Sequence, residues 1–190
     1  MGKERIILVT GLTGAGKTTY CTKLEKNKVG FAFSIDQWMT ALFWQDMPKN
    51  PKMNWFVENQ AWYLERIERC ESFITKEIIK NCSLGLISIL DLGFSKAKHR
   101  QKYIELARDI NAGVEIHYLK VPSDTRWSRV EQRNQERGET YSMHVDSDMF
   151  KFMEETFEDF TQNELNCLKK INKLRINSKR SLLDKNPHRT

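Results

Sequence analysis

Short apolar runs alternate with longer amphipathic segments along this chain. Four runs rich in β-branched, leucine or aromatic side chains cover residues 6–9, 31–35, 86–91 and 114–121, as expected for buried parallel strands. Between them, apolar residues recur at helical spacing, most clearly from about residue 54 to residue 80. Strands that alternate with helices in this way predict an α/β fold, with a parallel sheet between two helical layers.

The same patterns predict the remaining elements. Further helices are expected at residues 95–111, 123–137 and 147–160, and a fifth strand at residues 174–177. Gly113 is expected to end the first of these helices, because glycine is common just after a helix C-terminus. The prediction is therefore a sheet of about five strands.

The stretch from Gly11 to Thr18 reads GLTGAGKT and fits G-x-x-x-x-G-K-S/T at every fixed position. It lies between the first predicted strand and a predicted helix, which is the context that a phosphate-binding loop requires. Its glycines permit unusual backbone conformations, and successive N–H groups can then line a concavity for anions. Lys17 is expected to reach the β- and γ-phosphates, and the Thr18 hydroxyl to ligate Mg²⁺. The predicted nucleotide-binding residues here are Gly11, Leu12, Thr13, Gly14, Ala15, Gly16, Lys17, Thr18 and Thr19.

Two aspartates stand at the ends of predicted strands. Asp36 follows the second strand and Asp91 ends the third. Ligands of open α/β sheets bind at the carboxyl ends of the strands, so both side chains are expected near the phosphates. Asp91 fits the Walker B pattern, in which the acid supports Mg²⁺ directly or through water. Asp36 also has an interpretation as a helix N-cap, which is compatible with a role in the site.

Four arginines mark the helix predicted after the fourth strand. Arg126, Arg129, Arg133 and Arg137 share one helical face, and the glutamates nearby are too few to pair with all of them. A row of positive charge beyond a parallel strand suits stabilisation of a transferring phosphoryl group, which predicts a lid at about residues 122–140. A solvated surface helix is the alternative.

Aromatic residues are dense in the middle of the chain. Packing against the core is one role for them, and lining the pocket of an acceptor substrate is the other. The cluster comprises Trp38, Phe43, Trp44, Trp55, Phe56, Trp62 and Tyr63.

Composition narrows the class of protein. With 190 residues, 39% of them apolar and 29% charged, the chain is long enough for one globular domain with a full core. No apolar run approaches the ~20 residues of a membrane span, and we expect no signal peptide before the first strand. The four cysteines show no metal-ligand spacing, so reduced thiols, a cytoplasmic location and no membrane partner are expected.

The positive charge is concentrated at the C-terminal end. Residues 169–190 contain eight Lys or Arg and one Asp, a charge of +7, which leaves −1 of the net +6 for residues 1–168. We expect residues 1–168 to form the catalytic domain, followed by a basic segment with room for a last strand and then a partly disordered end. The nearly neutral charge of residues 1–168 argues against a nucleic-acid groove on this domain. A basic segment at residues 169–190 that acts as a binding arm is an alternative.

The glycine loop, the two strand-end acids and the arginine helix together resemble a known group. They are similar to the P-loop kinases among the AAA-family ATP-binding proteins, akin to zeta toxins, chloramphenicol phosphotransferase and the kinase domain of polynucleotide kinases. The resemblance covers roughly residues 6–160. It implies a three-layer α/β/α P-loop NTPase fold, nucleoside-kinase-like, with a helical lid.

The resemblance also implies site roles. Asp36 is the expected general base or substrate anchor, and Arg129 and Arg133 are the expected lid arginines. Arg126 belongs to the expected nucleotide-binding set, and Thr18 and Asp91 to the metal site. With Lys17, these residues predict an ATP- and Mg²⁺-dependent kinase that phosphorylates a hydroxyl of a small molecule.

One departure from the family bears on the acceptor. Polynucleotide kinases resemble D-x-x-R after the second strand, whereas Asp36 here is followed by Gln37, Trp38 and Met39. The arginine expected to hold an acceptor phosphate is missing, which argues against a nucleic-acid 5′-hydroxyl as acceptor. A nucleotide switch without any acceptor is the other alternative. No N-K-x-D sequence marks guanine specificity, so ATP is the expected nucleotide.

Overall fold

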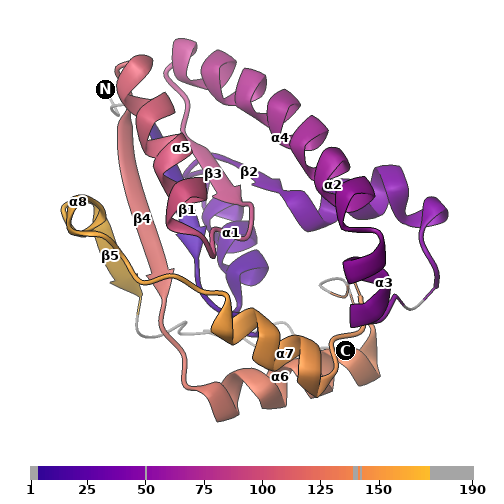
Figure 1. Cartoon of the computed structure of the whole chain (residues 1–190). Helices are drawn as coiled ribbons and strands as arrows, with labels where there is room; N and C mark the ends of the chain where they lie inside the picture. Colours follow the sequence, from indigo (N-terminus) through magenta and orange to yellow (C-terminus); the bar gives the residue numbers. More distant parts are fainter. Residues whose placement is uncertain (1–3, 50, 139–140, 142, 172–190) are drawn as a thin grey trace, which may run out of the picture.

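A parallel sheet of five strands forms the centre of the molecule (Figure 1). The computed structural model describes residues 4–49, 51–138, 141 and 143–171. All neighbouring strands pair in parallel, in the order β2-β3-β1-β4-β5. The strands are β1 (Arg5–Thr10), β2 (Phe31–Ser34), β3 (Ser88–Asp91), β4 (Gly113–Leu119) and β5 (Leu168–Ile171).

Helices cover both faces of this sheet, so the three-layer α/β/α prediction is confirmed (Figure 1). The first four helices are α1 (Lys17–Lys26), α2 (Ile35–Phe43), α3 (Met53–Glu58) and α4 (Gln60–Ser83), with a short 3₁₀ helix at Trp44–Asp46. The later ones are α5 (Ala97–Asp109), α6 (Ser123–Glu136), α7 (Ser147–Glu155) and α8 (Gln162–Leu165). No helix in these described stretches combines the length and the apolar character needed to cross a membrane.

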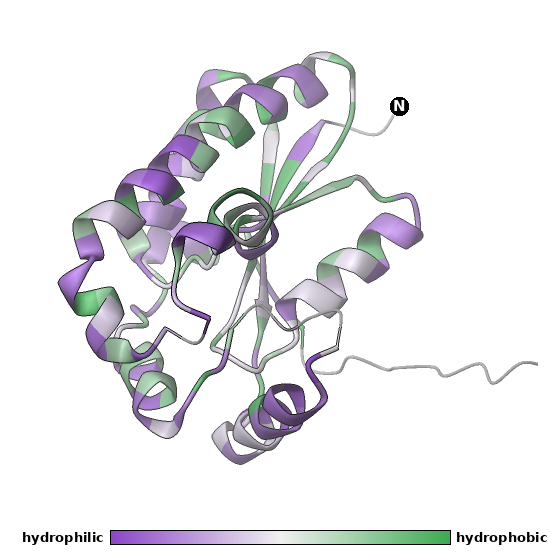
Figure 2. Cartoon of the chain, turned by 90° about the vertical axis from the view of Figure 1, so that its right-hand side faces the viewer, coloured by the Kyte–Doolittle hydropathy of each residue, from purple (hydrophilic) through white to green (hydrophobic). Residues whose placement is uncertain are grey.

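Alternate residues of the central strand, β1, belong to two separate apolar cores. Ile6 and Leu8 pack with the apolar faces of α2, α4 and α5, whereas Ile7 and Val9 pack with α1 on the opposite face. Successive side chains of a strand point to opposite faces, so a strand buried on both faces is apolar throughout. The helices carry both hydrophilic and hydrophobic residues, as Figure 2 shows, and the apolar side chains of α1, α2, α4 and α5 pack against the sheet. This is why β1 reads as an unbroken apolar run.

A third apolar cluster joins α3 to α6, which corresponds to the predicted lid, and to α7. Val130 of α6 and Met149 and Phe150 of α7 are buried together, and Met53 and Phe56 of α3 pack against them. The aromatic chain continues into α4, where the ring of Phe56 lies 5.2 Å from that of Tyr63 in an edge-to-face contact. Packing is therefore one role of the aromatic cluster.

The helix predicted from residue 54 to residue 80 is in fact two helices. The break is at Asn59, whose backbone N–H and side-chain amide both donate to the Trp55 carbonyl at 2.9 Å. A side chain that hydrogen-bonds its own neighbouring backbone competes with helix continuation, and this local effect explains the break.

Two other boundaries also differ from the prediction. Gly113 is the first residue of β4 rather than a helix stop, and Asn111 takes the positive φ of 55° after α5. Asparagine tolerates this conformation because its side chain can hydrogen-bond locally. The helix predicted to reach residue 160 ends at Glu155. The strand expected at residues 174–177 lies outside the described residues, and the fifth strand of the sheet is β5.

Candidate active site

The glycine loop connects the end of β1 to the start of α1. Gly14 and Gly16 have φ values of 80° and 91°, a region that favours glycine. Gly16 is the N-cap of α1 and has no side chain. The first N–H groups of α1 therefore receive no hydrogen bond from an N-cap side chain. A helix start of this kind attracts phosphate through its N–H groups and its dipole.

Three polar side chains meet beside this loop. The Lys17 ammonium group donates to the Gly11 carbonyl at 3.0 Å, and the Thr18 hydroxyl donates to the Asp91 carboxylate at 2.8 Å. The second contact joins the loop to the end of β3, which pairs with β1 in the sheet. The topology thus brings together two of the predicted site segments that lie 73 residues apart in the chain.

Asp91 has an environment suited to a metal ligand. Its side chain is only 6% exposed. The pKa of its carboxyl is raised, mainly by burial and also by the charge of Asp36, while Lys17 acts in the opposite direction. A hydroxyl and a carboxylate oxygen side by side fit Mg²⁺, which prefers oxygen donors and completes its shell with water and substrate phosphates. No group of three or more His, Cys, Asp and Glu side chains forms a richer metal cluster in the described part of the chain.

Asp36 lies in the first turn of α2 and not at the strand end itself. The N-cap of α2 is Ser34, whose hydroxyl accepts from the Gln37 N–H at 3.5 Å, so Asp36 is not the cap. Its carboxylate is exposed, and its charge acts on Asp91, Arg133 and Tyr63. Burial raises the pKa of Tyr63 to about 12, with a further contribution from Asp36.

Arg133 reaches toward the same region from α6. Burial lowers the pKa of its guanidinium, while Asp36 and Tyr141 act in the opposite direction. Its Nε atom is buried and has no hydrogen-bond partner among the residues described. A buried N–H without a partner is costly, so this atom is available to an incoming acceptor of hydrogen bonds.

The arginines of α6 differ in exposure and in the groups that they contact. Arg126 is 3% exposed and donates to the Thr13 carbonyl of the loop at 3.2 Å. Arg129 is exposed, and its guanidinium lies 3.5 Å from the Gly14 and Ala15 carbonyls. Arg137 caps the C-terminal end of α6 with a φ of 49°. The first two predicted arginines therefore lie at the phosphate loop, and Arg133 lies toward Asp36.

Sequence reasoning missed the contribution of α7. The Thr13 hydroxyl donates to the Met153 sulfur at 2.9 Å, and Arg126 forms an ion pair with Glu154. Helical spacing indicated the helix itself but carried no signal for this contact, since Thr13 and Met153 are 140 residues apart in the chain.

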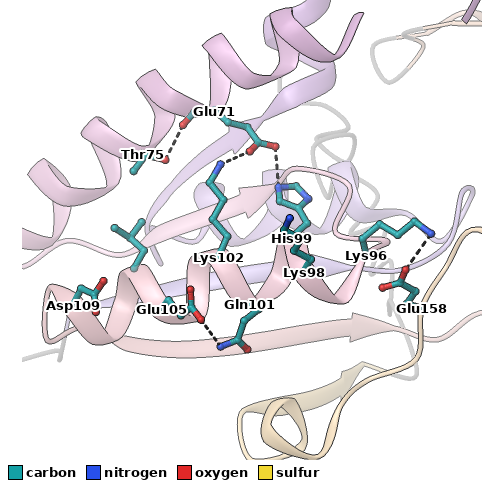
Figure 3. A pocket seen from close by; sticks show the side chains of 11 residues that line it. Glu71, Thr75, Lys96, Lys98, His99, Gln101, Lys102, Glu105, Asp109 and Glu158 are labelled. Carbon is teal, nitrogen blue, oxygen red and sulfur yellow. Dashed lines mark hydrogen bonds and ion pairs between the residues drawn. The ribbon is translucent and has the colours of Figure 1, made fainter. Parts of the chain in front are cut away.

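A groove of about 1030 Å³ lies between α4 and α5, and none of its lining residues belongs to the phosphate loop. Figure 3 shows Glu71 of α4 facing Lys102 and His99 of α5, at 2.7 Å and 2.8 Å. The nearby Lys96 pairs with Glu158 at 3.2 Å. The lining includes three lysines and four carboxylates, so this groove lacks the excess positive charge that a triphosphate requires.

Comparison with known proteins places this geometry in context. A family model described as "AAA domain" matches residues 6–160. No curated protein matches the chain. Among solved structures, a gluconokinase from Sinorhizobium meliloti 1021 has a TM-score of 0.56 and 15% identity, over 87% of this chain and 80% of that chain.

Two further solved structures share the fold. A sugar kinase from Janibacter sp. HTCC2649 has a TM-score of 0.55 and 15% identity, over 88% of this chain and 84% of its own. A chain of an RNA repair complex has a TM-score of 0.56 and 14% identity, over 83% of this chain but 47% of its own. At these identities the likeness shows the fold, which is that of P-loop kinases.

Proposed function

This chain belongs to the AAA domain family, and from that premise we propose that it is an ATP-dependent kinase. It transfers the γ-phosphoryl group of ATP to a hydroxyl of a small-molecule acceptor. The observation that carries this proposal is the hydrogen bond from Thr18 to Asp91, which unites the phosphate loop with the acid at the end of β3. Such a pair beside a loop lysine suits a nucleotide and its metal ion.

In this proposal the triphosphate lies on the loop from Gly11 to Thr19. Backbone N–H groups of the loop and the start of α1 cradle the phosphates, and Lys17 turns from the Gly11 carbonyl to the β- and γ-phosphates. Thr18 and Asp91 hold Mg²⁺, which neutralises charge on these phosphates when it is bound.

Phosphoryl transfer then needs a base and positive charge. Asp36 accepts the proton of the acceptor hydroxyl. The oxygen of that hydroxyl bonds to the γ-phosphorus, and the bond from this phosphorus to the leaving ADP oxygen breaks. Lys17, Arg129 and Arg133 stabilise the negative charge on the transferring group. The lid helix covers the site and excludes water, which would otherwise compete as acceptor.

A small-molecule acceptor is supported by the surroundings of Asp36. Position 39, where polynucleotide kinases would carry an arginine, is occupied by Met39, which is 5% exposed and packed in the core. The likeness to a chain of an RNA repair complex supports a second candidate, a nucleic-acid end, which the test must include.

The test is an ATP-consumption screen against hydroxyl-bearing metabolites, antibiotics, nucleosides and 5′-hydroxyl oligonucleotides. We expect one class of small molecule to stimulate ADP release and to gain a phosphate detected by mass spectrometry. Stimulation by oligonucleotides alone would support the second candidate. ATP hydrolysis at the same rate with every compound would indicate a nucleotide switch and contradict the kinase proposal.

Asp36→Asn tests the assigned base. Removing a general base lowers kcat by about 10²–10⁴-fold, while the Kd for ATP is expected to change little because Asp36 does not hold the phosphates. Asp46→Asn is the matched control, since Asp46 is also exposed and lies in the 3₁₀ helix just after α2. Transfer at the wild-type rate by Asp36→Asn would show that another group takes the proton.

A further inference from the structure

Glu154 lies on α7, outside every predicted site segment, yet it contacts the phosphate loop through a single intermediary. We propose that Glu154 is a positioning residue that holds Arg126 against the loop and thereby sets the shape in which the loop receives a triphosphate. This goes beyond the proposed function, because Glu154 itself touches no reacting atom. It rests on that proposal only in requiring that the loop binds a nucleotide.

Each of the three nitrogen atoms of the Arg126 guanidinium contacts a protein oxygen. Its Nε donates to the Val121 carbonyl at 3.0 Å, one Nη donates to the Thr13 carbonyl at 3.2 Å, and the other pairs with the Glu154 carboxylate. The group also lies 5.1 Å from the centre of the Phe150 ring. Arg126 therefore connects the start of α6, the loop and α7, because each of its three nitrogen atoms donates to a protein oxygen.

Glu154 is itself held in place. The Ser123 hydroxyl donates to the same carboxylate oxygen at 2.9 Å, and the Arg126 guanidinium lowers the pKa of Glu154, so the carboxylate stays ionised. The preceding residue, Met153, accepts from the Thr13 hydroxyl at 2.9 Å. Two neighbouring residues of α7 thus converge on Thr13, one directly and one through Arg126.

The geometry of the peptide bond transmits this contact to the phosphates. The Thr13 carbonyl and the Gly14 N–H belong to one planar trans peptide, so they point in opposite directions. Fixing the carbonyl on Arg126 therefore fixes the direction of the Gly14 N–H, one of the loop donors of the predicted concavity. Without the carboxylate, the Arg126 guanidinium loses its contact with α7, and its hold on the Thr13 carbonyl weakens.

The experiment measures the Kd of a fluorescent ATP analogue and the melting temperature of each variant in the full chain. Glu154→Gln keeps the shape but removes the charge, and we expect the Kd to rise about tenfold as a charge-assisted contact weakens. Glu155→Gln is the matched control, because Glu155 is exposed and adjacent on the same helix. Its Kd should equal that of the wild type.

A double-mutant cycle separates positioning from general stability. In an Arg126→Met background, Glu154→Gln should add no further increase in Kd, because its effect passes through Arg126. A merely structural role would lower the melting temperature and leave the Kd unchanged. Should Glu154→Gln fail to fold, Glu154→Asp serves instead, since it keeps the charge but shortens the reach to Arg126.

The outcomes are distinct. A folded Glu154 variant with a wild-type or tighter Kd, or additive effects in the cycle, overturns the positioning role and leaves the kinase proposal intact. A wild-type protein that binds no analogue at millimolar concentration overturns both.

Discussion

Gly14 shows how tightly one residue of the phosphate loop is constrained. Its φ is 80°, and a Cβ placed there would lie 2.4 Å from the Arg126 carbonyl oxygen. An alanine at this position would meet both a strained backbone and a fixed neighbour on α6. Gly14 occupies one of the four unspecified positions of the motif, so the sequence pattern alone does not reveal this contact.

Gly14→Ala should therefore reduce the free energy of unfolding by about 1–3 kcal/mol and weaken nucleotide binding more than tenfold. Urea unfolding and titration with an ATP analogue measure the two effects. Gly85→Ala is the control for backbone strain alone, since Gly85 has a φ of 74° and nothing within 4 Å of its Cβ position. Equal losses in both variants would mean that the overlap with Arg126 is unimportant.

At this scale the sequence predicted the loop, Lys17, Thr18 and Asp91 because a rigid local motif and the end of an apolar run mark them. It did not predict Glu154, because a single acid on an amphipathic helix looks the same whether it faces water or a buried arginine. The contact with Arg126 spans 28 residues and depends on how α7 packs on α6. Only the tertiary arrangement reveals it.

The helix α6 places chemically equal arginines in unequal surroundings. Arg126 is buried at its start, Arg129 is exposed above the loop, and Arg133 has a buried Nε without a described partner. Periodicity predicted their shared face but not these differences, which arise because the helix leans across the loop near its start and toward Asp36 further along.

Arg133→Lys should lower kcat about 10²–10³-fold, because lysine retains the charge but not the planar fork that can bind two phosphate oxygens. The Kd for the ATP analogue should change less than kcat, since Arg133 is assigned to the transferring group. Steady-state kinetics with the acceptor from the screen would measure this. Arg137→Lys, at the exposed end of the same helix, should retain the wild-type kcat, and an equal loss there would contradict a specific role for Arg133.

Helix boundaries show a second limit of sequence analysis at the scale of elements. The apolar spacing from residue 54 to residue 80 continues through Asn59, so periodicity predicted one helix where α3 and α4 are separate. The break depends on which hydrogen bond the Asn59 side chain makes, and its double contact with the Trp55 carbonyl is visible only in three dimensions.

Across the whole molecule, the order of apolar runs was sufficient to predict the parallel sheet, because the runs of β1 and β3 are buried on both faces and those of β2 and β4 are buried in part. The last strand was the exception. β5 reads Leu-Lys-Lys-Ile, with both lysines exposed, so it forms no apolar run at this edge of the sheet. Its lysine at position 169 instead joins an ion-pair group that links three strands.

That group centres on Glu115 of β4, which contacts Arg5 of β1 at 2.7 Å and Lys169 of β5 at 2.8 Å. Burial tends to raise the pKa of Glu115, but hydrogen bonds from Lys169, His117 and Arg5 outweigh it and lower the pKa from 4.5 to about 2. A carboxyl whose pKa is lower in the folded state contributes stability above its unfolded pKa and loses it as the pH falls.

Glu115→Gln should therefore flatten the pH dependence of unfolding between about pH 4.5 and pH 2. At neutral pH the variant should be less stable by about 1–2 kcal/mol, less than the full shift implies because solvent screens these partners. Urea titrations across this pH range provide the measurement. Glu68→Gln, an exposed change on α4, should leave the profile unaltered, and an unchanged profile for Glu115→Gln would contradict the assignment.

The apolar cluster of α3, α6 and α7 has a consequence for any movement of the predicted lid, which corresponds to α6. Met53 and Phe56 of α3 cover part of the buried surface of Val130, Met149 and Phe150. Separating α3 from α6 and α7 would expose these apolar side chains to water, at a free-energy cost of roughly 25 cal/mol for each Å² of apolar surface. Any opening of the predicted lid away from α3 is therefore opposed by the loss of these apolar contacts.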